Sequence, residues 1–169
     1  NSTKTIWFYS ESSLLVNRML EKGLWISRDR SELFAYLSSS LFLYSYIVRC
    51  RSRDGAYGRM TKGDFEAYYN LPDFRAIKRA GEKRAELRRL RAASAAFNGR
   101  EGGTLEERPN FYAQTLAAKN QTAGIGQLKR DLDETLCQVL EIPLSVLDEL
   151  YDRILERLSI YEEPEEGEE

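Results

Sequence analysis

Hydrophobic residues recur along most of the chain at the three- and four-residue spacing of amphipathic helices. The clearest case is Leu147, Leu150, Ile154, Leu158 and Tyr161, which are separated by 3, 4, 4 and 3 residues. This is a heptad seam of about two repeats, whereas a coiled coil usually needs about three or four. The seam therefore indicates either helices that pack on the chain's own core or an interface for self-association or a partner.

The same periodicity predicts an all-α protein, a helical bundle of about six helices. We expect helices at 10–22, 29–53, 64–69, 72–97 and 111–119, and a C-terminal helical pair at 125–161 that Pro143 divides. Residues 98–110 are rich in glycine and charge and form the clearest linker. A short strand-like run at 5–9 has no evident pairing partner. We interpret residues 1–161 as a single helical domain.

The segment 33–48 is apolar on every face of its predicted helix. A helix of this kind lies either deep in a core or in lipid. The segment contains four serines, and its uncharged stretch of 16 residues is shorter than the ~18–20 that a membrane span requires. Arginines at 49, 51 and 53 follow it, as at a cytoplasmic flank. We expect a buried helix, with a membrane-associated helix and a surface covered by a partner as alternatives.

Charge is distributed unevenly along the chain. The net charge is −2, yet residues 75–100 hold nine Lys and Arg against two Glu. Six of the last eight residues, 162–169, are Glu. Such a run buries too little apolar surface to offset the entropy of ordering, so we expect a disordered acidic tail.

The basic helix 72–97 presents cations on two faces. Glu82 and Glu86 are spaced to pair with the face that carries Lys78, Arg79, Lys83 and Arg89. A second face has no acidic neighbour on the helix. Arginine suits bidentate contacts with phosphate or carboxylate. The predicted anion-binding residues are Arg84, Arg88 and Arg91, together with Arg75 and Arg79. A solvated helix, an acidic protein surface, the chain's own tail and nucleic acid are the alternatives.

Aromatic residues gather just before the basic helix, in the segment 64–74. Aromatic side chains beside basic ones stack on bases in single-stranded RNA binders. They also anchor loops to a core or an interface. We interpret Phe65, Tyr69 and Phe74 as anchors.

The sequence lacks the constellations of most enzymes. It contains no histidine, which removes the commonest general base and metal ligand. Two cysteines, Cys50 and Cys137, are too few for a zinc site or a disulfide scaffold and are interpreted as buried thiols. The glycine-containing loops match no phosphate-binding motif. We therefore expect no catalytic residues, metal, cofactor or small-molecule substrate, and an intracellular protein of the cytoplasm or an organelle interior.

The function we predict is that of a non-catalytic structural or adaptor subunit of a larger macromolecular assembly, acting through contacts with other protein subunits. The second hypothesis is a helical RNA- or DNA-binding protein that uses the basic helix at 75–91. The third is a membrane-surface-associated helical protein.

Overall fold

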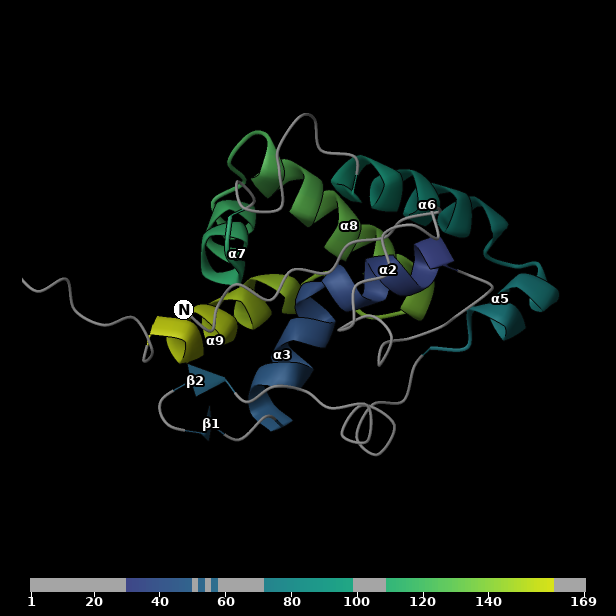
Figure 1. The fold of residues 1–169 in the computed structure, drawn as a ribbon. Helices are drawn as coiled ribbons and strands as arrows, with labels where there is room; N and C mark the ends of the chain where they lie inside the picture. Colours follow the sequence, from purple (N-terminus) through teal and green to yellow (C-terminus); the bar gives the residue numbers. More distant parts are fainter. Residues whose placement is uncertain (1–29, 50–51, 54–55, 58–71, 99–108, 160–169) are drawn as a thin grey trace, which may run out of the picture.

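The computed structural model describes residues 30–49, 52–53, 56–57, 72–98 and 109–159. Within these residues the chain forms seven helices and a single two-stranded ladder (Figure 1). The elements are α2 (Arg30–Ser38), α3 (Ser40–Arg49), β1 (Ser52–Arg53), β2 (Ala56–Tyr57), α5 (Phe74–Ala80), α6 (Arg84–Asn98), α7 (Phe111–Lys119), α8 (Ile125–Leu140) and α9 (Val146–Ser159). The all-α fold class is confirmed. The predicted elements at 5–9, 10–22 and 64–69, most of the linker and the tail at 162–169 lie outside the described residues.

Helix α8 is the central element. Helix α6 packs on one side of α8 and α7 on another, while α9 packs against both α7 and α3. Leu132 and Leu136 of α8 join Phe34, Leu87 and Leu90 in one core cluster. A second cluster joins α3, α7 and α9. The bundle is therefore held both by consecutive helices, such as α7 and α8, and by helices far apart in the sequence, such as α3 and α9.

The predicted helix at 29–53 is wrong in its continuity, because the chain bends at Ser39 between α2 and α3. The Ser39 hydroxyl donates to the Tyr36 carbonyl at 2.6 Å and accepts from the Phe42 amide at 3.2 Å. A serine at this position competes with the helix's own hydrogen bonds and caps the helix that follows. The predicted helix also extends too far, since Ser52 and Arg53 pair with Tyr57 and Ala56 in an antiparallel ladder.

The two helices of the segment 33–48 lie largely in the core. Leu33, Phe34, Leu37, Phe42 and Leu43 are all buried. Among the described residues, no helix combines the length and apolar character needed to cross a membrane. The apolar character of this segment is accounted for by packing inside the bundle.

The predicted basic helix at 72–97 is also divided. Asp73 caps α5 by accepting from the Ala76 amide at 2.9 Å, and α5 ends at Gly81 with a φ of 77°. This left-handed conformation is costly for residues with a Cβ and is the usual way to end a helix with glycine. The chain then turns and restarts as α6 at Arg84. The break separates Arg75 and Arg79 from the arginines of α6.

Replacing Gly81 tests the cost of this turn. Gly81→Ala should lower the free energy of unfolding by about 1–2 kcal/mol, because a Cβ is strained at positive φ. Gly81→Asn should lose less, because asparagine adopts the left-handed region more readily. Urea unfolding followed by circular dichroism gives both values. Equal stability of Gly81→Ala and the unmodified chain would contradict the assignment of this turn.

Candidate functional site

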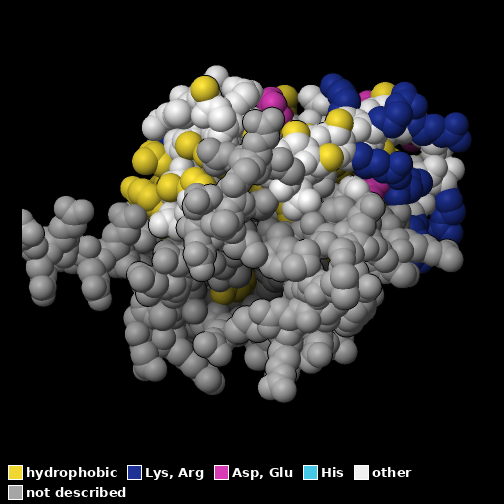
Figure 2. Space-filling view, turned by 45° about the horizontal axis from the view of Figure 1, so that its top comes forward, with side chains coloured by type: hydrophobic (Ala, Val, Ile, Leu, Met, Phe, Trp, Pro, Cys, Tyr) yellow, Lys and Arg dark blue, Asp and Glu magenta, His cyan; other side chains and the backbone are white. Residues whose placement is uncertain are grey.

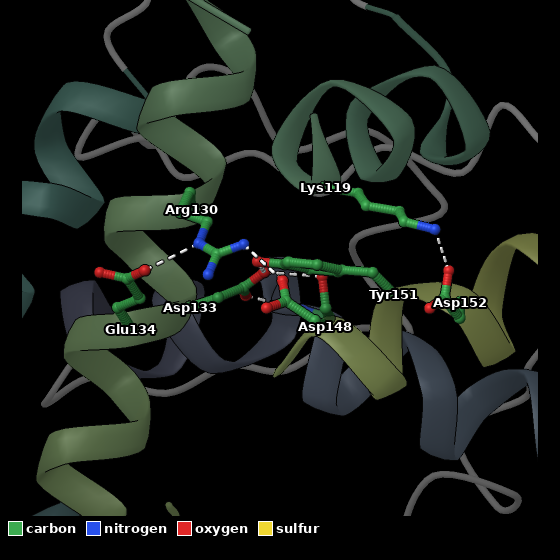
Figure 3. Close-up of polar contacts among 8 residues, drawn as sticks. Lys119, Arg130, Asp133, Glu134, Asp148, Tyr151 and Asp152 are labelled. Atoms are coloured by element: carbon green, nitrogen blue, oxygen red, sulfur yellow. Dashed lines mark hydrogen bonds and ion pairs between the residues drawn. The ribbon is translucent and has the colours of Figure 1, made fainter. Parts of the chain in front are cut away.

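A polar network lies inside the bundle, where the sequence predicted none. Lys129 and Asp133, four residues apart on α8, are both fully buried, with Lys129 Nζ 3.8 Å from Asp133 Oδ1. Asp133 accepts from the Ser40 amide at 2.8 Å, the Ser40 hydroxyl at 2.7 Å and the Tyr151 hydroxyl at 2.9 Å. Lys129 donates to the Ser38 carbonyl. Figure 3 shows the Tyr151 side chain reaching Asp133 from α9.

Burial governs the ionisation of this network. Desolvation lowers the pKa of Lys129, an effect that the charge of Asp133 opposes. Desolvation and then Asp133 raise the pKa of Tyr151, which keeps its hydroxyl protonated as a donor. The network joins the α2–α3 bend to α8 and α9, and its members are fully buried. We therefore interpret it as a structural clamp rather than a reaction centre.

A signal for this network was present in the sequence. Lys129 and Asp133 lie at helical spacing on the same face of α8 as Leu132 and Leu136, so they point into the core. Asp131 is exposed and accepts from Gln127, and Glu134 accepts from Arg130.

Removing the carboxylate of Asp133 should be strongly destabilising. Asp133→Ala leaves the buried Lys129 unpaired and three donors without an acceptor, so we expect a loss of about 3–5 kcal/mol in the free energy of unfolding. Tyr151→Phe removes one donor and should cost about 1 kcal/mol. Asp131→Ala, an exposed carboxylate on the same helix, should change stability by less than about 0.5 kcal/mol. Denaturant unfolding measures all three, and a Tyr151→Phe protein as stable as the unmodified chain would contradict the clamp.

Cys137 lies beside this network and is buried as a free thiol. Desolvation, together with the charges of Asp133 and Glu134, raises its pKa from 9.0 to about 12. The folded state therefore holds the thiol proton more tightly than the unfolded state does. Stability should fall as the pH rises from 9.0 towards 12, by up to about 1.4 kcal/mol per pH unit from this group.

Cys137→Ala should flatten this alkaline decline. The measurement is the free energy of unfolding of both proteins between pH 8 and pH 11, and the comparison is between slopes, because the substitution also leaves a small cavity. Parallel slopes above pH 9 would contradict the raised pKa of the Cys137 thiol.

Ion pairs balance the charges where α9 meets α7 and α8. Arg130 donates to Glu134 and to Asp148, each at 2.7 Å (Figure 3). Lys119 pairs with Asp152, and Arg153 pairs with Glu149 at 2.7 Å. Cations and carboxylates therefore alternate on this part of the surface.

Three cations of α5, α6 and the turn between them form ion pairs within the chain, although not with the helical neighbours that the sequence suggested. Glu32 of α2 is 2% exposed and receives Arg91 at 2.6 Å and Lys78 at 3.0 Å. Lys83 pairs with Glu141 at 2.8 Å and donates to the Val139 carbonyl. Arg91, which we predicted to bind an external anion, thus has a carboxylate partner from another helix.

The remaining arginines form what we call the arginine surface: Arg79 of α5 and Arg84, Arg88 and Arg89 of α6. All four side chains are exposed, and no ion pair joins any of them to another described residue. Arg75 is also exposed on α5. Figure 2 shows Lys and Arg side chains gathered at one end of the described surface, the end formed by these two helices. The surface is therefore rich in arginine, and none of its four arginines is held in an ion pair within the part of the chain that is described.

The other predicted site residues fall in the core or outside the described part. Leu147, Ile154 and Leu158 of the seam are fully or almost fully buried, and Leu150 is half-buried against the same clusters. Phe74 is buried in the core cluster around α8. Tyr161, Phe65 and Tyr69 lie outside the described residues. The seam and Phe74 thus serve the packing of the chain itself.

The described residues contain no group of three or more His, Cys, Asp or Glu side chains placed to hold a metal ion. Comparison with protein-family models, curated proteins and solved structures finds no match to this chain.

Proposed function

We propose that the chain is a non-catalytic structural or adaptor subunit of a larger macromolecular assembly, and that it contacts an anionic part of that assembly through the arginine surface. The observation that carries this proposal is that the cations of α5, α6 and the turn between them fall into two groups, one in ion pairs and one without. Lys78, Lys83 and Arg91 form ion pairs with carboxylates of the chain, whereas the four arginines of the arginine surface are exposed and form none with a described residue. Arginine retains its charge at all physiological pH values and presents five donors in a fixed fork.

The arginine surface lies away from the point where the described chain ends. Helix α9 ends at Ser159, and Figure 1 shows this end on the opposite side of the molecule from α5. The described part of the chain therefore ends on the other side of the molecule from the arginine surface. This supports an anion supplied by another molecule.

Contacts through the leucine seam or with a membrane surface draw less support from the described residues. Contacts through the leucine seam would need side chains that are buried in the chain's own core. Insertion of the segment 33–48 into a membrane surface would need side chains that pack between α6, α8 and α9. The exposed arginines of α5 and α6, in contrast, take no part in packing the core.

Native purification with paired variants tests the proposal. The tagged chain should elute with a large assembly, whereas Arg84→Gln/Arg88→Gln should shift towards the 19.5 kDa of the chain alone. The reason is that two of the four charges of the surface are lost. Size-exclusion chromatography of a mild lysate of the cells that produce the tagged chain measures the size at which each protein elutes.

The matched control is Arg153→Gln/Arg157→Gln on α9, which removes the same net charge from the other end of the molecule. It should remain in the assembly, and thermal melting should show that both double variants fold. An unmodified chain that elutes alone, or an Arg84→Gln/Arg88→Gln protein that stays in the assembly, would overturn the proposed function.

A further inference from the structure

The outward face of α6 combines a low ridge with flanking charges. At 3.6 residues per turn, the buried Leu87, Leu90 and Phe97 define the inner side of the helix. Ala85 and Ala92 lie opposite them and are exposed. Arg84 and Arg88 stand on one flank of this alanine ridge, and Arg89 stands on the other. A partner can therefore approach the helix backbone closely while arginines reach past it on both sides.

This face lacks the large apolar side chains that anchor a protein interface. The exposed residues of α5 and α6 are only alanines and arginines, and none of the exposed large hydrophobic residues in the described part belongs to these two helices. Protein interfaces usually centre on buried aromatic or aliphatic anchors. Contacts with nucleic acid are instead dominated by basic side chains on phosphates. The composition of the face thus favours a phosphate backbone over an acidic protein.

The shape of the face favours a double helix of DNA. An α-helix with its side chains is about 10–12 Å wide, and the major groove of B-form DNA is about 12 Å wide. A helix lying along that groove has a phosphate strand on each side, which matches arginines on both flanks of the alanine ridge. The major groove of double-stranded RNA is too narrow and deep for this arrangement. Phe74, beside the surface, is buried and so is not placed to stack on the bases of a single strand.

We propose that α6 binds the major groove of double-stranded DNA, with Arg84 and Arg88 on the phosphates of one strand and Arg89 on those of the other. Arg79 extends the contact from α5 across the Gly81 turn. This inference rests on the proposed function, because it names the anion that the arginine surface contacts in the assembly.

Salt-dependent binding of the full chain to a fluorescein-labelled, blunt DNA duplex two helical turns long tests this inference. Each phosphate contact contributes a slope of about −0.9 to a plot of log Kobs against log salt concentration, so three or four contacts predict about −2.7 to −3.6. Arg84→Gln/Arg88→Gln should weaken binding and make the slope shallower by about 1.8. Fluorescence anisotropy at a series of KCl concentrations gives both values.

Arg153→Gln/Arg157→Gln is the control and should bind like the unmodified chain. A flat salt profile, or unchanged binding by Arg84→Gln/Arg88→Gln, would overturn the inference. So would an RNA duplex of equal length that binds as tightly as DNA, or polyglutamate that competes as well as DNA does.

The outcome is separable from that of the proposed function. If DNA fails to bind while Arg84→Gln/Arg88→Gln still leaves the native assembly, then the DNA inference falls and the proposed function stands. If the Arg84→Gln/Arg88→Gln protein stays in the assembly, then the proposed function is wrong, whatever the DNA measurement shows.

Discussion

The hydrogen bonds to Asp133 are the interaction on which the arrangement of this bundle depends. A buried carboxylate is costly unless its oxygens are paired, and here they accept from the backbone and hydroxyl of Ser40 and from the hydroxyl of Tyr151. Lys129 adds an opposite charge and a contact to the Ser38 carbonyl. One turn of α8 thus fixes the α2–α3 bend and the middle of α9 together.

The position of α2 in turn controls the charge balance of the surface. Glu32 belongs to α2, is almost fully buried and forms ion pairs with Lys78 of α5 and Arg91 of α6, which share its single carboxylate. Lys83 is held in the same way by the end of α8. The cations without such a partner are those of the arginine surface, on the two helices that meet at the Gly81 turn. The Asp133 network positions α2, and Glu32 of α2 in turn holds two cations of the surface.

The sequence predicted the helical class and the position of α7 because their signals are local: three- to four-residue periodicity and polar caps. It failed at two breaks. Ser39 and Gly81 were read as helix interior, since both residues are tolerated there and only the tertiary environment decides that the chain bends. The partners of Lys78, Lys83 and Arg91 were missed for a related reason. Spacing along one helix shows neighbours at three and four residues, but Glu32 and Glu141 come from other helices, 46 or more residues away in the sequence.

The hydrogen bond from the Ser40 amide has a dynamic consequence. First-turn amides of a helix usually face solvent or a local cap and exchange their protons by fraying. The Ser40 amide instead donates to a carboxylate 93 residues away, in the middle of α8. Its proton can exchange only when the α2–α3 bend separates from α8. The hydrogen-exchange rate of this single amide therefore reports how often the α2–α3 bend separates from α8, although the amide sits at the end of a helix.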